Sequence, residues 1–380
     1  MSDKPNSTNA SDQGCTDFDA HPSVPEPFFT VVLPVYGVER YISNALSDLQ
    51  AQTFHDWEAV VVDDATPDAS CELAQGFALR DPRFRIVRHA SNAGLAAARN
   101  TGLSHARGRY VTFLDPDDRY DSDLLLRVHE SLAEYPTQAV MFGHVEEFYD
   151  SDEQLRDTVD CSVILDGSHW VLDGAESIRK WVVTFEKGIH YGYAWNKFYE
   201  TDYVREHGLT FRDEPLIEDI AFNIEAFQTL ESLSLVELPL YRYAKREKAN
   251  LTNQSLDNYY ELHRKRMALL TAQQKDWGLF DDEVRETLGG LMARYVVSAV
   301  SRKLAVGDDD GQVREWLASL FDDPLYEELV PYARADSRML NLAYKPLRDR
   351  SVPGTMLVAR AANFAKRRAK GGFDKARMKR

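Results

Sequence analysis

Two patterns of apolar residues alternate along the first 150 residues of the chain. Short β-branched runs are typical of buried strands, and apolar residues three or four apart predict helices that bury one face. The expected strands cover residues 28–33, 59–62, 84–87, 110–114 and 139–143. The expected helices cover residues 41–49, 70–79, 95–105 and 123–134. This alternation predicts an α/β fold with a mostly parallel, Rossmann-like sheet flanked by helices.

The pattern changes on either side of this region. Residues 1–27 are polar and rich in Ser, Asn, Asp and Pro, which predicts a disordered leader. Residues 150–160 are polar and acidic and predict a surface loop. Mixed periodicity follows, so we expect one domain over residues 28–250. Helical spacing then returns, and residues 251–352 predict a helical C-terminal region.

The last segment, residues 353–380, combines apolar and basic residues. Its apolar positions are Met356, Leu357, Val358, Ala361 and Phe364, and a basic cluster follows them. This combination predicts an amphipathic helix that lies on anionic lipid. A solvated basic tail is the alternative interpretation.

Composition and charge narrow the class of protein. The chain has 380 residues and a formal net charge of −16, and such an acidic body repels nucleic acid. Its apolar runs are shorter than the roughly 18 to 20 residues that a membrane-spanning helix needs. Three widely spaced cysteines, Cys15, Cys71 and Cys161, argue against a disulfide framework and a CxxC zinc site. These features favour a cytoplasmic protein that does not bind nucleic acid.

Acidic residues follow two of the expected strands, at the edge of a parallel sheet where ligands bind. Asp115 and Asp117 lie two apart, and an extended chain would point both side chains to one face. Carboxylates suit Mg²⁺ or Mn²⁺, which leave positions open for substrate phosphates. The alternative is a solvated acidic turn that caps the next helix. Asp63 and Asp64 form either a turn or a contact to a base or ribose.

Residues 92–100 begin a helix with few large side chains. A ligand could therefore approach the backbone closely, with Arg99 or the helix N-terminus facing phosphate. A tightly packed helix with a surface Arg99 is the alternative.

The order of these segments resembles the family 2 glycosyltransferases, which have the nucleotide-diphospho-sugar transferase (GT-A) fold. The resemblance covers about residues 28–250, and Gly37 stands where the family has Asn. The segments that carry it are residues 32–41, 52–54, 62–68, 92–100 and 113–118.

The resemblance implies a site for a nucleotide-sugar donor. Its residues would be Pro34, Tyr36, Glu39, Asp64, Asn92, Gly94, Arg99, Asn100 and Asp115. Asp64 would contact the base. A divalent cation, Mn²⁺ or Mg²⁺, would bind Asp117 directly, with Asp115 at the ribose or beside the metal, or the two acids would exchange these roles.

The second half of the domain resembles the acceptor side of the same family. Trp195 and Lys197 would lie beside the acceptor, and the pair Glu218 and Asp219 stands where the family places its base. We assign Asp219 as catalytic base and Glu218 as supporting acid. The pair could equally begin a helix, where carboxylates favour the N-terminal end.

The resemblance implies an inverting, metal-dependent glycosyltransferase. The enzyme would move a sugar from a nucleotide diphosphate, UDP, to a hydroxyl of a glycan or lipid-linked glycan, as in extracellular polysaccharide or cell-wall glycan assembly. It would work in the cytoplasm, at the inner face of the membrane if the tail binds lipid. The alternative is an inactive nucleotide-sugar binding or scaffold protein of the same fold, which would have lost the catalytic acids.

Overall fold

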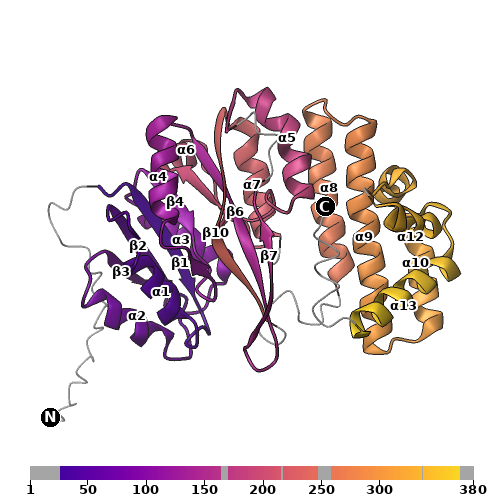
Figure 1. Ribbon diagram of the computed structural model, residues 1–380, viewed down its shortest axis with the longest axis horizontal. Helices are drawn as coiled ribbons and strands as arrows, with labels where there is room; N and C mark the ends of the chain where they lie inside the picture. Colours follow the sequence, from indigo (N-terminus) through magenta and orange to yellow (C-terminus); the bar gives the residue numbers. More distant parts are fainter. Residues whose placement is uncertain (1–25, 164–169, 215–216, 247–257, 336, 369–380) are drawn as a thin grey trace, which may run out of the picture.

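The computed structural model describes residues 26–163, 170–214, 217–246, 258–335 and 337–368. An α/β domain with a central sheet is followed by a helical C-terminal region, and the two lie side by side along the long axis of the molecule (Figure 1). The expected fold class is therefore confirmed. Residues 1–25 of the expected leader lie outside the described residues.

The central sheet runs in the order β3-β2-β1-β4-β9-β6-β10-β5, with β7 beside β6 and β8 beside β10. Its first four strands are parallel, and β9 is antiparallel to both β4 and β6. The sheet is thus parallel at one side and mixed beyond β4. The strands are β1 (Phe29–Val35), β2 (Trp57–Asp63), β3 (Phe84–Arg88), β4 (Tyr110–Phe113), β5 (Arg119–Tyr120), β6 (Ala139–Tyr149), β7 (Leu155–Cys161), β8 (Val171–Asp173), β9 (Lys197–Glu200) and β10 (Ser232–Arg246).

Helices cover both faces of the parallel strands. On β2, Val60 and Val62 pack with Ala98 on one face, whereas Ala59 and Val61 belong to the main core on the other. The four expected helices begin and end within one residue of the observed ones. The helices of this domain are α1 (Ile42–Gln50), α2 (Ser70–Ala78), α3 (Leu95–His105), α4 (Leu124–Glu134), α5 (Ala175–Lys187), α6 (Thr201–Glu206) and α7 (Glu218–Thr229).

Small residues let α3 approach the sheet closely. A Cβ atom added to Gly102 would lie 2.1 Å from Cγ1 of Val32 on β1, a distance that no side chain can accept. Gly102, and Ala98 against Val60 and Val62, therefore let α3 pack closely on the sheet, and this close packing positions Arg99 on the same helix.

The surface loop expected over residues 150–160 is wrong. Strand β6 continues to Tyr149, where the chain turns. Strand β7 then pairs antiparallel with β6, from Leu155 opposite Tyr149 to Cys161 opposite His144. Most side chains of β7 are polar and at least partly exposed, so the apolar alternation that identifies a half-buried strand is missing. The acidic segment is one arm of a β-hairpin.

The helical C-terminal region follows as expected and shares a continuous core with the sheet domain. Tyr191 and Gln273 are hydrogen bonded across the junction, from hydroxyl to amide oxygen, at 3.0 Å. The helices are α8 (Tyr259–Asp276), α9 (Asp282–Val306), α10 (Asp310–Leu320), α11 (Pro324–Leu329), the 3₁₀ helix η2 (Val330–Tyr332), α12 (Arg338–Arg348) and α13 (Val352–Arg368).

The apolar residues of the tail divide between two sides of α13. Met356 and Ala359 are buried, and α13 packs against α9, so the expectation that Met356 faces lipid is wrong. Leu357 and Phe364 are exposed. No helix of the described chain combines the length and apolar character that crossing a bilayer requires, and residues 369–380 lie outside the description.

Candidate active site

The acids after β4 lie in a tight turn. The backbone N–H of Asp118 donates to the carbonyl oxygen of Asp115 at 2.9 Å, so the extended geometry expected for Asp115 and Asp117 is wrong. Strand β5 follows, and α4 begins only at Leu124 with no side-chain cap. The acids therefore do not cap the next helix.

Asp118 fixes this turn to β10. Its Oδ2 accepts a 2.7 Å hydrogen bond from the hydroxyl of Tyr241, and its Oδ1 accepts one of 2.8 Å from the backbone N–H of Ala244. Burial holds the pKa of Asp118 well above its usual value. We did not single out this residue from the sequence, although its position directly after Asp117 was the available signal.

Asp115 and Asp117 are the partly exposed acids of the turn, with side-chain exposures of 26% and 33%. Burial, followed by the charge of Asp115, raises the pKa of Asp117 to about 6. Burial also raises the pKa of Asp115. Two crowded carboxylates with raised pKa values gain from a bound cation, and hard oxygen ligands fit Mg²⁺ or Mn²⁺.

Arg99 connects this turn to the start of α7. Its guanidinium is buried; Nη2 donates to Oδ1 of Asp115 at 2.9 Å, and Nη1 donates to Oδ1 of Asp219. Nη1 also lies 3.6 Å from Oε1 of Glu218. The structure therefore brings Asp115, Glu218 and Asp219, from the two halves of the domain, together around the guanidinium of Arg99. The alternative of a surface Arg99 is wrong.

Glu218 and Asp219 form the first turn of α7. The second carboxylate oxygen of Asp219 accepts from the backbone N–H of Ala194 at 3.1 Å. Oε2 of Glu218 is buried without a hydrogen-bond partner. Burial, followed by the charge of Asp219, raises the pKa of Glu218 to about 7. The two acids therefore differ: Asp219 is held by two donors, while Glu218 takes up a proton near neutral pH.

Asp64 holds the loop before α3. Its Oδ1 accepts from the backbone N–H of Ala93 and its Oδ2 from that of Gly94, both at 2.8 Å. Nδ1 of His89 lies 2.7 Å from the same carboxylate. Gly94 has a φ of +91°, a left-handed conformation that favours glycine. Asn92 lies exposed in this loop. Asp64 thus positions the backbone that leads into α3.

The loop after β1 is tied to the segment before α2. Gly37 donates its N–H to Oγ1 of Thr66 at 2.9 Å, and Glu39 accepts the N–H of Ala69 at 3.2 Å. Pro34 is buried in β1, whereas the ring of Tyr36 is half exposed. Tyr36 and Glu39 are therefore the residues expected here that are exposed and could meet a nucleotide.

Arg246, the last residue of β10, reaches the turn from the other side. Its Nη1 lies 3.5 Å from Oδ2 of Asp117, and its Nε donates to Glu153 at 3.2 Å. Glu153 lies between β6 and β7 and also accepts from the hydroxyl of Tyr41 at 3.1 Å. The guanidinium lies over the Tyr41 ring, 4.0 Å from its centroid. One arginine thus joins the acidic turn, the hairpin and α1.

Trp195 and Lys197 are buried behind the acids. Trp195 stacks on Tyr241 with ring centroids 4.1 Å apart. Nζ of Lys197 donates to the carbonyl oxygens of His190 at 2.7 Å and Tyr193 at 2.6 Å, among others. These contacts shape the loop whose Ala194 N–H holds Asp219.

Asn100 has a similar supporting position. Its side-chain amide makes two 2.8 Å hydrogen bonds with the backbone of Phe211, one donated and one accepted. It therefore anchors the segment that precedes α7 to α3.

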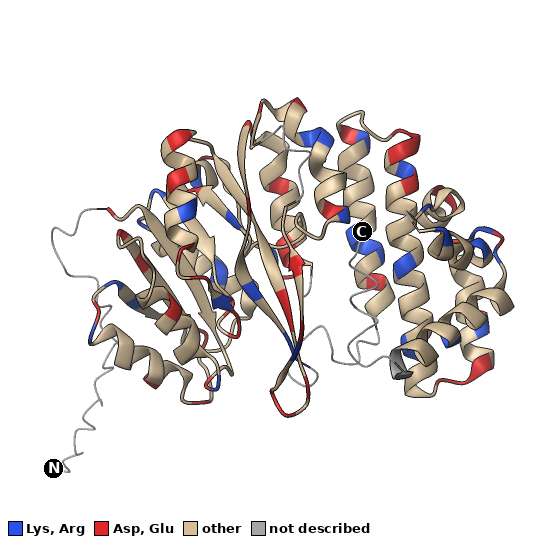
Figure 2. Cartoon of the chain, viewed as in Figure 1, with Lys and Arg blue, Asp and Glu red and all other residues tan. Residues whose placement is uncertain are grey.

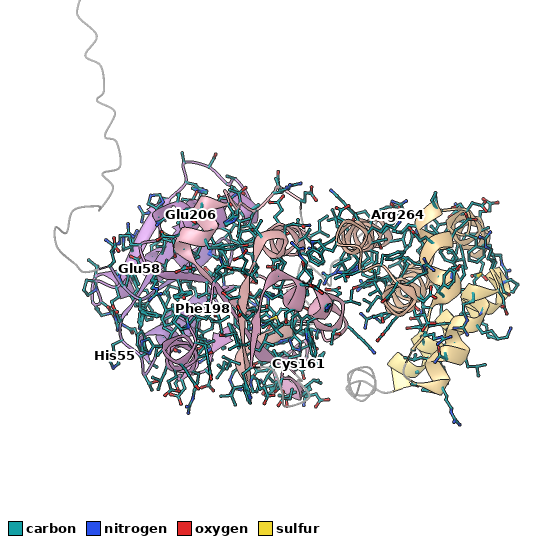
Figure 3. The ribbon with its side chains drawn as sticks, turned by 90° about the horizontal axis from the view of Figure 1, so that it is seen from above. His55, Glu58, Cys161, Phe198, Glu206 and Arg264 are labelled. Carbon is teal, nitrogen blue, oxygen red and sulfur yellow. The ribbon has the colours of Figure 1, made fainter. Side chains whose placement is uncertain are left out.

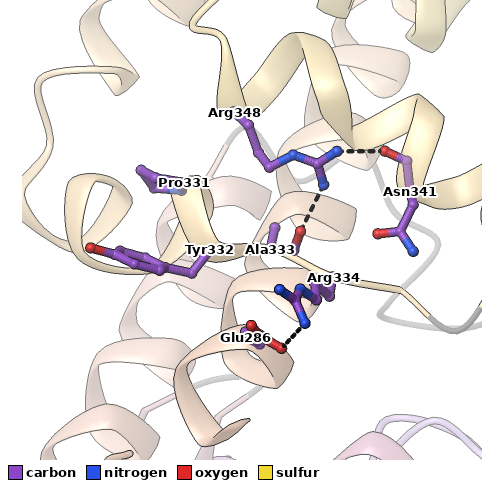
Figure 4. A pocket seen from close by; sticks show the side chains of 7 residues that line it. All are labelled: Glu286, Pro331, Tyr332, Ala333, Arg334, Asn341 and Arg348. Carbon is purple, nitrogen blue, oxygen red and sulfur yellow. Dashed lines mark hydrogen bonds and ion pairs between the residues drawn. The ribbon is translucent and has the colours of Figure 1, made fainter. Parts of the chain in front are cut away.

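A separate cavity of about 390 Å³ lies in the helical region, between α9, η2 and α12 (Figure 4). Arg348 in its wall donates to the carbonyl oxygens of Ala333 at 2.7 Å and Asn341 at 2.9 Å, and Arg334 pairs with Glu286 at 3.1 Å. These donors are already engaged, so the acids of the sheet domain remain the stronger candidate site.

Part of this chain is similar in sequence to glycosyltransferases. Residues 30–198 match the family model described as glycosyl transferase family 2. The uncharacterized glycosyltransferase EpsJ of Bacillus subtilis is 32% identical over 218 residues, which cover 57% of this chain and 61% of EpsJ. The putative glycosyltransferase EpsH of the same organism is 30% identical over 223 residues, 57% of this chain and 60% of EpsH. The matched region thus spans about three fifths of these relatives.

Solved structures extend the likeness into the helical region. The crystal structure of S. aureus TarS residues 1–349 in complex with UDP-GlcNAc is similar with a TM-score of 0.60. Sequence identity is 18%, and the match covers 90% of this chain and 91% of that chain. This chain and residues 1–349 of TarS therefore share a fold.

Proposed function

We propose that this chain, which carries a glycosyl transferase family 2 domain on a GT-A fold, is an inverting, metal-dependent glycosyltransferase. The observation that carries the proposal is the bridge of Arg99 from Asp115 to Asp219. Because of this bridge, a donor held at the acidic turn and an acceptor at the start of α7 would meet in one place.

Asp117 would be the direct ligand of a divalent cation, with Asp115 beside it. Their side chains are partly exposed, and burial together with the charge of Asp115 raises the pKa of Asp117 to about 6 in spite of the nearby Arg246. When bound, Mn²⁺ or Mg²⁺ would offset the charge that develops on the departing diphosphate. Asp118 and Tyr241 would keep the turn in place.

Asp219 would accept the proton of the acceptor hydroxyl as general base. The donors from Arg99 and Ala194 orient its carboxylate. A single displacement with one base inverts the configuration at the anomeric carbon, and it needs no covalent intermediate. Glu218, whose pKa is raised to about 7, would support Asp219 by gaining or losing a proton near neutral pH.

The donor would be a UDP-sugar. TarS was solved with UDP-GlcNAc and with UDP, and the present chain shares its fold. Tyr36 and the loop of Asn92 and Gly94 would line the nucleotide pocket, together with Pro34, Glu39 and Asp64. Arg99 and Asn100 would act from beneath by holding the acids and the loop before α7.

The acceptor would be a hydroxyl of a glycan or lipid-linked glycan, in the assembly of cell-wall or extracellular polysaccharide. We further propose that the protein works in the cytoplasm at the inner face of the membrane. Leu357 and Phe364 are exposed on α13, and the sequence beyond them is strongly basic. Together they suit an anionic lipid surface.

The alternative is an inactive nucleotide-sugar binding or scaffold protein. Such a protein would be expected to lose the acids, yet all four are present: Asp115, Glu218 and Asp219 share Arg99, and Asp117 pairs with Arg246. The acids therefore favour the enzyme.

A panel of nucleotide sugars tests the proposal. Each sugar is incubated with the protein in Mn²⁺, Mg²⁺ or EDTA, and both donor hydrolysis and the melting temperature are measured. We expect one UDP-sugar to be cleaved and to stabilise the fold only with metal. Stabilisation without turnover for any donor or acceptor would favour the scaffold alternative.

Liposome flotation tests the membrane contact. The full chain is compared with the variant Leu357→Ser/Phe364→Ser, whose substitutions lie on the exposed side of α13. We expect the full chain, but not the variant, to float with vesicles that contain anionic lipid. Equal flotation of both would refute a contact through this helix.

A further inference from the structure

Three potential metal ligands meet inside the β6–β7 hairpin. His144 and Glu146 lie on β6, two residues apart and on one face, and Cys161 on β7 is the register partner of His144. One ligand atom from each lies within 4.8 Å of the other two, and all three residues are buried. Among the described residues, no other group of three such side chains comes this close.

Three polar atoms of His144 and Glu146 lack a hydrogen-bond partner. Both ring nitrogens of His144 are buried without a hydrogen bond, and so is Oε2 of Glu146. The other oxygen of Glu146 pairs with Nζ of Lys245. Buried polar atoms nearly always have a partner, so three orphaned atoms in one place call for a ligand.

We propose that His144, Glu146 and Cys161 bind a transition-metal ion, most simply Zn²⁺. Imidazole nitrogen, carboxylate oxygen and thiolate sulfur are the ligands that zinc uses, at about 2.0 to 2.3 Å. Hard cations such as Mg²⁺ avoid sulfur, so this site would differ in preference from the acidic turn. Small rotations of the three side chains would bring their ligand atoms to tetrahedral separation.

A fourth ligand would have to come from outside this group of three. His190 has a buried Nδ1 without a hydrogen bond, and its ring centroid lies 5.8 Å from that of His144. Either this nitrogen or a water molecule would complete the shell. A water molecule alone, without metal, is the competing way to satisfy the orphaned atoms.

The charges around the group bear on this choice. Lys245 and Lys197 act on His144 from β10 and β9, and with His190 they lower its pKa, after burial as the largest cause. The positive charges of these two lysines repel a divalent metal ion unless its ligands carry negative charge. Binding releases the thiol proton of Cys161 to solvent, and the resulting thiolate and the carboxylate of Glu146 then balance the two charges of the ion. Figure 2 shows that the charged residues of the hairpin are mainly acidic.

The site lies behind the catalytic acids. The ring of Trp195 meets that of His144 edge to face at 5.0 Å and stacks on Tyr241, which holds Asp118. In the view from above, Cys161 lies well apart from Glu58 of the parallel strands (Figure 3). An ion there would stiffen the layer that supports the acidic turn, without contact to the donor.

Metal analysis of the untagged full chain tests the proposal. The protein is loaded with Zn²⁺, dialysed against a weak chelator and analysed by elemental mass spectrometry, and Co²⁺ is used as a spectroscopic probe. We expect one zinc ion per chain and a thiolate-to-cobalt absorption band. Cys161→Ser and His144→Asn should weaken binding more than about 100-fold, since even residues outside the coordination sphere contribute about 10- to 100-fold.

Two variants serve as controls. Cys71→Ser removes another buried cysteine and should keep both the zinc and the cobalt band. Asp117→Asn should also keep the zinc, which separates this site from the acidic turn and from the proposed transfer activity. Circular dichroism checks that each variant folds.

Either of two results would overturn the proposal. One is a folded wild type that retains less than about a tenth of an equivalent of zinc after loading, which would leave water as the occupant. The other is equal zinc and cobalt binding in wild type and Cys161→Ser.

Discussion

Arg99 and Asp219 are 120 positions apart in sequence, and the guanidinium of the first donates to the carboxylate of the second. Nη2 of the same side chain holds Asp115 at 2.9 Å. Because Arg99 is buried, removing either the arginine or the acids would leave buried charges without a partner, which is costly. This relationship makes Arg99 and Asp219 the most informative residues to change.

Asp219→Asn should abolish transfer. The amide keeps the shape of the side chain but cannot accept a proton, so we expect kcat/KM to fall by about 100- to 10,000-fold. UDP affinity, measured by calorimetry, should change little, because we propose that Asp219 acts on the acceptor and not on the nucleotide. Substantial residual turnover would reject this residue as the base.

Arg99→Met should destabilise the fold strongly. The change leaves Asp115, Glu218 and Asp219 without their shared cation, and removing one partner of a buried ion pair costs about 3 to 5 kcal/mol. Urea unfolding at neutral pH measures the loss. Arg127→Met is the control, because Arg127 pairs with Glu130 on the surface and should matter by less than about 1 kcal/mol. Equal losses would contradict the bridging role.

Asp117→Asn should stabilise the metal-free protein at neutral pH. The pKa of Asp117 rises from 3.8 to about 6 on folding, so the native state binds more protons than the unfolded state between these values. Stability therefore falls as pH rises from about 4 to about 6. Because the side chain is partly exposed, we expect Asp117→Asn to raise the free energy of unfolding by about 1 to 2 kcal/mol above pH 6.

The same variant should lose stabilisation by Mn²⁺. In the wild type this stabilisation should weaken as pH drops below about 6, because the ion competes with the proton on Asp117. Thermal unfolding at pH 4 and pH 8, with EDTA or Mn²⁺, measures both effects. Asp173→Asn on the exposed end of β8 is the control and should behave as wild type. A metal response that survives in Asp117→Asn would remove this residue as ligand.

Tyr241→Phe should loosen the acidic turn. The buried carboxylate of Asp118 would lose its 2.7 Å donor, at a cost of about 1 to 3 kcal/mol. Mn²⁺ affinity, measured by calorimetry, should fall as well. Tyr203→Phe removes a buried hydroxyl far from the turn, so it should lower stability but leave Mn²⁺ binding unchanged. Equal Mn²⁺ affinity in both variants would show that Tyr241 only supports the core.

The parallel half of the fold could be read from the sequence because its strands are continuous apolar runs and its helices are amphipathic. Helix α3, for example, covers residues 95–105 as expected. The hairpin could not be read in this way. Its second strand, β7, is polar along an outer edge of the sheet and carries no apolar signal.

The acids themselves were visible in sequence, but their partners were not. Asp115 and Asp117 were found by position after a strand. The donors that hold Asp118 come from Tyr241 and Ala244, more than a hundred residues further along the chain, and no local pattern connects them. Trp195 and Lys197 were expected beside the acceptor, and their burial depends on the packing of β10 over the loop.

Arg246 connects the acidic turn after β4 to the β6–β7 hairpin. Its guanidinium neutralises part of the charge on Asp117 and at the same time secures Glu153, which is fastened to Tyr41. The hydroxyl of Tyr41 also donates directly to Glu153, so the hairpin stays joined to the start of α1 independently of Arg246. A cation bound at Asp117 would therefore weaken only the contact between Arg246 and the acidic turn.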